Sequence, residues 1–440
     1  MYINACPLVY FFSSLVTKNI YMKRIFFKFL LLCFPLFISG QTLRLDSCQQ
    51  KARLNYPLIQ QFDLIEKTSD YNLSNAAKAY LPQLSLNARA TYQSDVTSLS
   101  INIPNVVIPT LSKDQYQASI ELSQLIWDGG AIKATKKSLQ ATAESEMQKI
   151  ELDLYGLKDR VNQMFFGVLL LNEQLKQNSI LQEELTTNYK RIEALKENGV
   201  ANQTDLDIIS VERINAQQRF TDLQSTRKSF VEMLSALTAI EINENTVFQK
   251  PLVPVIDFGA EIKRPELLML DAQAAAIESQ RDIISASNLP KLGFFVQGGY
   301  GKPALNMLSN DFAPFYIGGL RLSWNLSGFY TQKSNFGKID VSKKSIDVQK
   351  ETFIFNNNLL NKQSQNEIEK LNQIIRKDDE VIRLRKNIKK ATKVKIENGT
   401  ATVTDLLREI NAENTAIQGK LMHEIQLFMA SYQYLNNTNN

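Results

Sequence analysis

The sequence predicts a mainly α-helical fold with a small β part, in which long antiparallel coiled-coil helices accompany four strands in each chain. Three observations support this prediction. The chain repeats part of its own sequence after 200 residues, each half holds two runs of alternating polarity, and long stretches without proline keep apolar residues three and four positions apart. Each half therefore combines two strands with long helices.

A tandem duplication organises the chain. The segment ENGVANQTDL at 197–206 returns as ENGTATVTDL at 397–406, with seven of the ten letters identical. A second pair of similar segments, YQASIELS at 116–123 and YIGGLRLS at 316–323, is also separated by 200 residues. We therefore predict a first repeat at 41–242, a linker at 243–263 that is rich in proline, and a second repeat at 264–440.

Two runs in each half alternate between apolar and polar side chains. In the first run, Leu84, Leu86 and Tyr92 share one face, while Ser85 and Arg89 lie on the other. The four predicted strands occupy 84–92, 116–124, 292–300 and 316–324. Strands of about 9 to 12 residues can cross a bilayer when tilted, and aromatic residues at their ends suit its two interfaces. A small soluble sheet fits the alternation equally well.

The remaining segments have a helical period. No proline occurs from Ala131 to Leu195, and apolar residues recur there at spacings of three and four, which is a heptad seam. Its members are Met147, Ile150, Leu154, Leu157, Val161, Met164, Val168, Leu171 and Leu175. A helix of this length would extend about 100 Å. Further helices are predicted at 203–239, 331–396 and 407–428, with shorter ones at 47–79 and 265–287.

Four strands are too few to close a membrane barrel. An open sheet in lipid would leave the N–H and C=O groups of its edges without partners, and closed membrane barrels begin at about eight strands. At least two chains must therefore contribute strands, and three chains would give twelve. The polar faces carry Arg89, Glu121 and Arg321, which indicates an aqueous lumen.

The segment MKRIFFKFLLLCFPLFISGQ, which begins at Met22, has the basic, apolar and small-residue regions of a secretory signal peptide. We expect residues 1–40 to be this signal with an over-extended start, so that translation begins at Met22 and cleavage follows Gly40. A retained membrane anchor is the alternative. Cys48 would then be the one cysteine left, which excludes an intramolecular disulfide.

The composition argues against an enzyme and against nucleic-acid binding. One histidine, His423, and three cysteines leave little material for metal sites or for Ser/His and Cys/His catalysis. A formal net charge of +5 is spread along the chain and forms no basic arm. We predict no catalytic residue, no cofactor and no metal.

In several features the chain resembles the TolC-type outer-membrane efflux proteins over about residues 43–435. These features are the duplication, a Leu-Pro pair before the first strand of each half, IWDGG at 126–130, and a glycine turn followed by Thr-Asp between long helices. The resemblance implies a homotrimer with a twelve-stranded barrel in the outer membrane and a helical tunnel across the periplasm. It further implies an exit duct for tripartite efflux or type I secretion, with a periplasmic adaptor protein, an inner-membrane transporter and outer-membrane lipid as partners. A stand-alone porin and a periplasmic coiled-coil scaffold are the alternatives.

The repeated segments at 197–206 and 397–406 are predicted to be turns between two antiparallel helices. Gly199 and Gly399 suit a left-handed turn. Asn202 and Thr402 are N-cap types, each followed three positions later by an acid, which explains these aspartates structurally. The resemblance also implies functional roles. The adaptor-contacting residues would be Gly199, Val200, Ala201, Gly399, Thr400 and Ala401, and the periplasmic entrance would comprise Thr204, Asp205, Thr404, Asp405 and Arg408.

The second tip departs from the pattern of the family. Ala401 and Ile396 stand where an arginine and a tyrosine lock the closed state, and Arg408 stands where a second acid would follow Asp405. Arg408 lies one turn from Asp405 and could neutralise it. The sequence alone therefore decides neither which residues would lock a closed state nor which ions would pass.

Overall fold

The computed structural model describes residues 42–97, 110–244 and 246–439, so the predicted signal peptide lies outside the described residues. The chain divides into two compact units. In the smaller unit, β1 (Thr42–Leu43) pairs in parallel with β4 (Val247–Phe248), and the Gln249 N–H donates to the Leu43 carbonyl at 2.9 Å. The larger unit comprises residues 44–242 and 250–440, which include the second predicted repeat and the first one from residue 44 onward.

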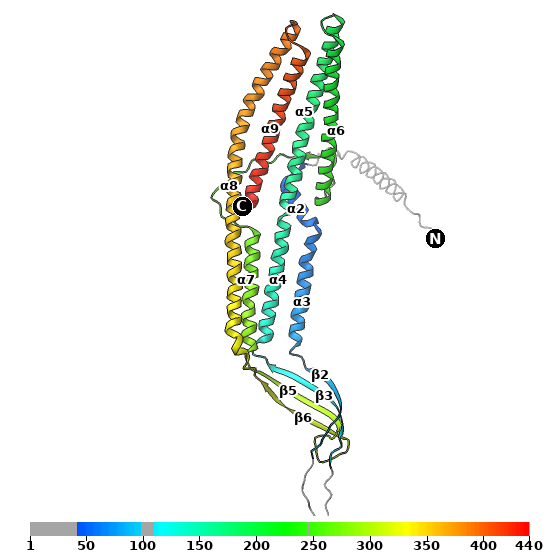
Figure 1. The fold of residues 1–440 in the computed structure, drawn as a ribbon, viewed down its shortest axis with the longest axis vertical. Helices are drawn as coiled ribbons and strands as arrows, with labels where there is room; N and C mark the ends of the chain where they lie inside the picture. Colours follow the sequence, from blue (N-terminus) through cyan, green and yellow to red (C-terminus); the bar gives the residue numbers. More distant parts are fainter. Residues whose placement is uncertain (1–41, 98–109, 245, 440) are drawn as a thin grey trace, which may run out of the picture. The chain divides into compact units, whose positions relative to one another are not determined.

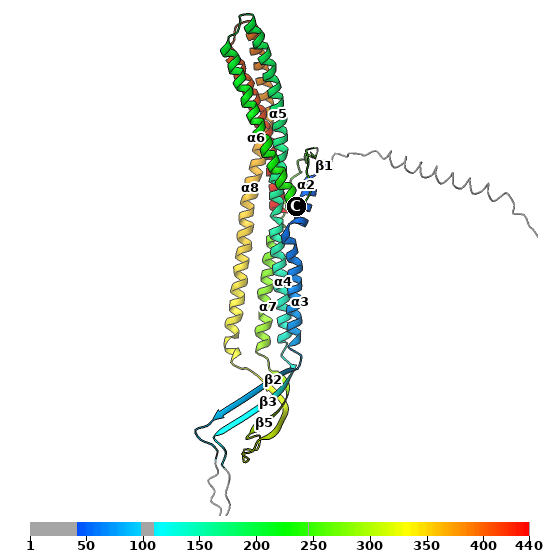
Figure 2. The same cartoon turned by 90° about the vertical axis from the view of Figure 1, so that its right-hand side faces the viewer.

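Long helices and one four-stranded sheet make up the larger unit (Figure 1). The helices are α2 (Leu45–Asn55), the short 3₁₀ helix η1 (Pro57–Gln60), α3 (Gln61–Lys78), α4 (Ala131–Tyr155), α5 (Leu157–Glu197), α6 (Gln203–Thr238), α7 (Pro265–Ser287), α8 (Gly328–Glu397) and α9 (Val403–Thr438). The strands are β2 (Gln83–Tyr92), β3 (Asp114–Trp127), β5 (Lys291–Lys302) and β6 (Ala313–Ser323). Within this unit the helices run side by side, and the sheet lies at one end of them (Figure 2).

Three predicted elements differ from the structure. The predicted helix at 47–79 is broken at Tyr56, whose extended backbone (φ −68°, ψ 127°) is what a residue before proline prefers. The predicted helix from Ala131 is two helices, because Gly156 interrupts the regular pattern while keeping helical dihedrals. β3 has 14 residues, whereas nine were predicted at 116–124, and its pairing with β5 continues past a register shift between Leu125 and Trp127.

The predicted heptad seam faces other helices. All nine of its members are buried or partly buried, and Val161 and Val168 are fully buried. Two neighbours that the heptad pattern does not include, Phe165 and Phe166, are the largest fully buried side chains. The Phe166 ring stacks on Phe428 of α9 with 5.9 Å between centroids. The first repeat is thereby joined to the last helix of the second.

The sheet also joins the two repeats. Its strand order is β2-β3-β5-β6, every neighbouring pair is antiparallel, and the central pair β3–β5 brings one strand from each half together. Among the described helices, none combines the length and the apolar character that crossing a membrane requires.

Candidate functional site

One face of the sheet is apolar across all four strands. Leu86 on β2 lies opposite Ile120 on β3, and the same row continues through Gly298 on β5 to Tyr316 on β6. This face is open to solvent in the single chain, with Leu86 75% and Leu320 68% exposed. An apolar surface that extends over a whole sheet indicates a site that another molecule or a membrane covers.

The opposite face carries polar side chains that bond to one another, and on β5 and β6 it also carries Phe295, Phe315 and Ile317. Arg89 donates to the Gln117 side chain at 3.0 Å, and Arg321 donates to the Glu121 carboxylate at 3.3 Å across β3 and β6. Gln297 donates to the hydroxyl of Ser119. The three charged residues expected on a lumen-facing surface, Arg89, Glu121 and Arg321, therefore do lie on one face, which suits contact with water.

Both edges of the sheet are open. β2 pairs only with β3, and β6 pairs only with β5, so the outward N–H and C=O groups of these two strands have no strand partner among the described residues. Unpaired edges cost several kcal/mol per group in lipid and invite pairing with another chain in water. The two open edges are therefore available for pairing with strands of another chain.

Aromatic side chains mark both ends of the apolar face. At one end, the Phe312 ring stacks on Tyr116 and Tyr300 with centroid distances of 6.1 and 5.7 Å. At the other end lie both tryptophans of the chain. The β3 bulge places Trp127 opposite Leu292 on the apolar face, and Trp324 directly follows the end of β6. From Tyr116 to Trp127 the strand spans about 36 Å, or about 25 Å along the axis at a 45° tilt, close to the apolar band of membrane barrels.

The two helix tips are built in the same way. Gly199 (φ +75°) and Gly399 (φ +68°) are left-handed, and they end α5 and α8. In each tip the residue after the glycine forms a hydrogen bond with the last turn of the preceding helix. The Val200 N–H donates to the Leu195 carbonyl at 2.9 Å, and the Thr400 N–H donates to the Lys395 carbonyl at 2.8 Å. These bonds satisfy carbonyls that the helix ends would leave free.

Both aspartates of the tips complete capping boxes. The Asp205 N–H donates to the Asn202 side chain, and the Asn202 N–H donates back to the Asp205 carboxylate, both at 3.0 Å. The second tip repeats this arrangement with Thr402 and Asp405. The structural explanation for the two acids therefore holds, and one carboxylate oxygen of each is already engaged.

Asp405 is more strongly engaged than Asp205. It also accepts a hydrogen bond from the Thr402 hydroxyl at 2.7 Å and lies 3.3 Å from the Arg408 guanidinium. The Thr402 hydroxyl and N–H, aided by Arg408, hold the pKa of Asp405 below its ordinary value. A lowered pKa means that this cap contributes stability above the ordinary pKa of the carboxyl, and that the contribution is lost only as the pH falls through the lowered value.

The predicted tip residues differ in exposure. Val200 is 62% exposed, and Gly199, Gly399 and Thr400 are exposed as well. Thr204, Thr404 and Arg408 are also exposed, whereas Asp205 and Asp405 are half-buried. Ala201 and Ala401 are only partly exposed, because both pack against a core shared by the two tips. Leu206 and Ile209 of the first tip meet Ile396, Val403, Leu406, Leu407 and Ile410 of the second in that core.

An ionic joint, which the sequence reasoning missed, connects the two hairpins. Lys389 on α8 lies 2.7 Å from Glu184 on α5 and 2.5 Å from Glu413 on α9. Burial opposes the charge of Lys389, but the hydrogen bond that it donates to Glu184 and the nearby Glu413 carboxylate outweigh burial and raise its pKa. Arg385 pairs with the buried Glu409 one turn away. The matching spacing of four in 385/389 and 409/413 is the signal that could have revealed this joint.

No protein-family model matches the sequence, and no curated protein matches it. Solved structures match it over most of its length. The outer-membrane channel OprN has a TM-score of 0.63 at 14% identity, covering 90% of this chain and 89% of its own. CmeC of Campylobacter jejuni has a TM-score of 0.60 at 12% identity, with 90% and 85% covered. The open state of MtrE from Neisseria gonorrhoeae gives 0.63 at 12% identity, with 90% and 89% covered. The chain has the fold of the TolC-type outer-membrane channels.

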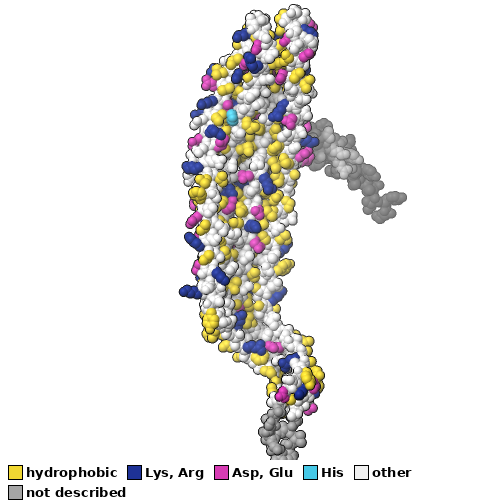
Figure 3. Space-filling model, viewed as in Figure 1, with side chains coloured by type: hydrophobic (Ala, Val, Ile, Leu, Met, Phe, Trp, Pro, Cys, Tyr) yellow, Lys and Arg dark blue, Asp and Glu magenta, His cyan; other side chains and the backbone are white. Residues whose placement is uncertain are grey.

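The TolC-type fold accounts for the whole arrangement rather than one part of it, since about 90% of this chain is matched. The predicted fold class is confirmed: a mainly helical chain carries a small β part at one end of its long helices. Figure 3 shows acidic and basic side chains scattered over one face of the helices without a field of a single sign. Among the described residues, no three His, Cys, Asp or Glu side chains form a metal cluster.

The left-handed tip glycines give a testable contribution to stability. Gly399→Ala should destabilise the TolC-type fold by about 1 to 2 kcal/mol, because a Cβ is strained at φ +68° even though nothing lies within 4 Å. Gly419→Ala is the matched control, since Gly419 lies inside α9 with equally open space, and alanine there should stabilise the helix by about 0.5 to 1 kcal/mol. Thermal unfolding of both variants measures the difference, and equal shifts would contradict the strained turn.

Proposed function

We propose that the chain is an outer-membrane exit duct of a tripartite efflux or type I secretion system. In this proposal three copies share a twelve-stranded barrel, and their helices continue it as a tunnel into the periplasm. Substrates pass passively from an inner-membrane transporter, coupled by a periplasmic adaptor protein, to the exterior. The duct has no catalytic role and needs no cofactor.

The observation that carries this proposal is the four-stranded sheet with an exposed apolar face and two open edges. Lipid covers an apolar face of this height, and edges in lipid are tolerated only when the sheet is closed. Identical copies supply the missing strands at the lowest structural cost, because each β2 edge can meet the β6 edge of a neighbour. A periplasmic coiled-coil scaffold would leave this face without a use.

The structural neighbours support the same location. OprN, CmeC and MtrE are outer-membrane channels, and this chain matches nearly the full length of each. The tip residues then take their proposed roles. Thr204, Asp205, Thr404, Asp405 and Arg408 line the periplasmic entrance, and Gly199, Val200, Ala201, Gly399, Thr400 and Ala401 meet the adaptor. Within this second group, the exposed Val200 and Thr400 offer the adaptor more surface than the packed Ala201 and Ala401 do.

Ion selectivity in planar bilayers tests the duct and its entrance together. The assembled wild type should conduct and prefer cations. Asp205→Asn should reduce this preference several-fold, whereas Asp405→Asn should change it less, because the Arg408 guanidinium already offsets the charge of Asp405. Arg408→Gln should increase the preference for cations, because Asp405 then loses its cationic partner.

Asp222→Asn is the control for this measurement, since it removes an acid from α6 about five turns away from the tip. Absence of conductance from the assembled protein would contradict a duct. If all three entrance variants kept the wild-type selectivity, the duct would stand, but the entrance assignment would be wrong.

A further inference from the structure

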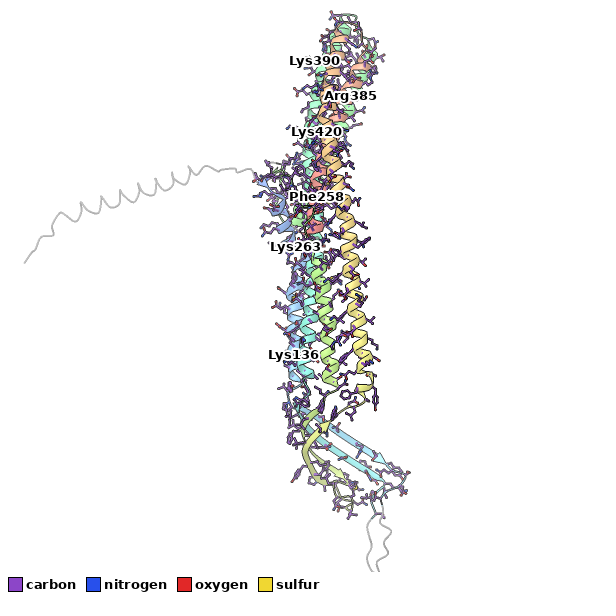
Figure 4. The ribbon with its side chains drawn as sticks, turned by 90° about the vertical axis from the view of Figure 1, so that its left-hand side faces the viewer. Lys136, Phe258, Lys263, Arg385, Lys390 and Lys420 are labelled. Atoms are coloured by element: carbon purple, nitrogen blue, oxygen red, sulfur yellow. The ribbon has the colours of Figure 1, made fainter. Side chains whose placement is uncertain are left out.

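A groove of about 820 Å³ opens where the helices meet the sheet. Its lining includes Lys133, Lys136 and Lys137 of α4, Asp282 and the nearby Leu289 from the region of α7, and Tyr80 from the segment before β2. Figure 4 shows Lys136 on the helices close to the end that carries the sheet. The groove thus combines three cationic side chains with an apolar wall.

The positive charge of the groove is incompletely balanced. Lys137 lies 2.7 Å from the Asp282 carboxylate, but neither Lys133 nor Lys136 has an acidic partner among the described residues. The start of α4 does not supply the binding groups, because Asp128 already accepts the N–H groups of Gly130 and Ile132 at 2.9 and 2.6 Å. Two unpaired ammonium groups in one groove therefore favour an anionic ligand.

The groove continues from the apolar face of the sheet. Gln124 on that face donates to the Tyr80 carbonyl at 2.5 Å, and Trp324, directly after β6, donates to the Asn288 carbonyl at 3.0 Å, next to Leu289. An apolar surface and an ammonium pair are therefore adjacent, which matches a ligand with both an apolar and an anionic part.

The depth of the lysines fits the polar layer of a bilayer. Trp127 and Trp324 mark the end of the apolar band, as tryptophans do at membrane interfaces. Lys133 and Lys137 are the third and seventh residues of α4, which places them about 3 to 9 Å beyond the helix start. The headgroup layer beyond the hydrocarbon core is about 5 to 7 Å thick on each side, so lysine side chains here reach headgroup phosphates.

We propose that this groove binds the phosphate of an anionic phospholipid of the periplasmic leaflet, with the acyl chains against the apolar face of the sheet. The inference rests on the proposed function, because only a sheet embedded in the membrane meets lipid there. Lys133 and Lys136 bind the phosphate, Lys137 stays paired with Asp282, and Leu289 contacts the start of the acyl chains.

Native mass spectrometry of the detergent-extracted assembly, titrated with phosphatidylglycerol, tests the site. The variant K133Q/K136Q leaves the Lys137–Asp282 pair intact and should bind the lipid roughly 10- to 30-fold more weakly, since each lysine near an anionic headgroup contributes about 1 kcal/mol, or about fivefold in affinity. The control K386Q/K390Q removes the same charge from α8, far from the sheet, where Figure 4 shows Lys390, and should bind as the wild type does.

Three outcomes would overturn the proposal. K133Q/K136Q could bind phosphatidylglycerol as tightly as the wild type, phosphatidylcholine could bind as well as phosphatidylglycerol, or inorganic phosphate in millimolar excess could displace the lipid, which would show a free-anion site instead. Membrane fractionation of the same preparations distinguishes a failure of the proposed function from a failure of the lipid site alone. A wild type absent from the outer membrane contradicts the proposed function, whereas equal lipid binding by all variants in that membrane contradicts the groove alone.

Discussion

Leu86→Arg should abolish insertion of the chain into the outer membrane. Leu86 lies on the apolar face of β2, in the row formed with Ile120 and Tyr316, near the middle of the band between the two aromatic ends. An arginine near the bilayer midplane of a barrel costs about 2 to 4 kcal/mol. Because three chains would share one barrel, the assembly would lose about 6 to 12 kcal/mol.

The neighbouring residue supplies the control. Asn87→Arg adds the same side chain to the same strand, but Asn87 pairs with Ser119 on the polar face. This variant should insert normally. Density-gradient fractionation and the migration of unheated samples on SDS gels report insertion and assembly. Equal behaviour of the two variants would show that the sheet does not separate lipid from water.

Lys389→Ala should loosen the two helical hairpins from each other. The change leaves the carboxylates of Glu184 and Glu413 facing one another without their shared cation, and the Glu413 side chain is only 11% exposed. Breaking a buried ion pair costs about 3 to 5 kcal/mol, and the partial exposure of Glu184 reduces this to about 2 kcal/mol. The unfolding temperature should fall, and the conductance of the assembled channel should rise as the tips separate more easily.

Two further variants isolate the ionic joint. Lys386→Ala removes an exposed lysine one turn earlier on α8 and should change neither the unfolding temperature nor the conductance. Adding Glu413→Gln to Lys389→Ala should restore part of the lost stability, because it removes one of the two facing charges. If Lys386→Ala and Lys389→Ala had the same effect, the joint would have no special role.

Local patterns predicted most of the fold. α7 begins at Pro265 as expected, because proline is favoured in the first turn of a helix and carries no N–H that the helix would need. The tips were predictable from Gly199 and Gly399, whose turn chemistry is local. The strand pattern predicted both faces of the sheet, since residues two apart share a face.

Features that depend on distant contacts could not be predicted in the same way. The bulge that brings Trp127 onto the apolar face is visible only in the pairing of β3 with β5. Ala201 and Ala401 resemble ordinary loop residues until the shared core of both tips is seen. The Lys389 joint requires α5, α8 and α9 to be placed side by side, which no single helical pattern reports.

The number of chains in the extracted assembly is the sharpest test of a barrel shared between chains, because the sheet of one chain cannot close. Native mass spectrometry of protein purified from outer membranes should give a single species of three chains that share one continuous β structure, with the backbone amides of β2 and β6 protected from hydrogen exchange. A folded single chain in the membrane, with both edge strands exchanging freely, would rule out a barrel shared by three chains.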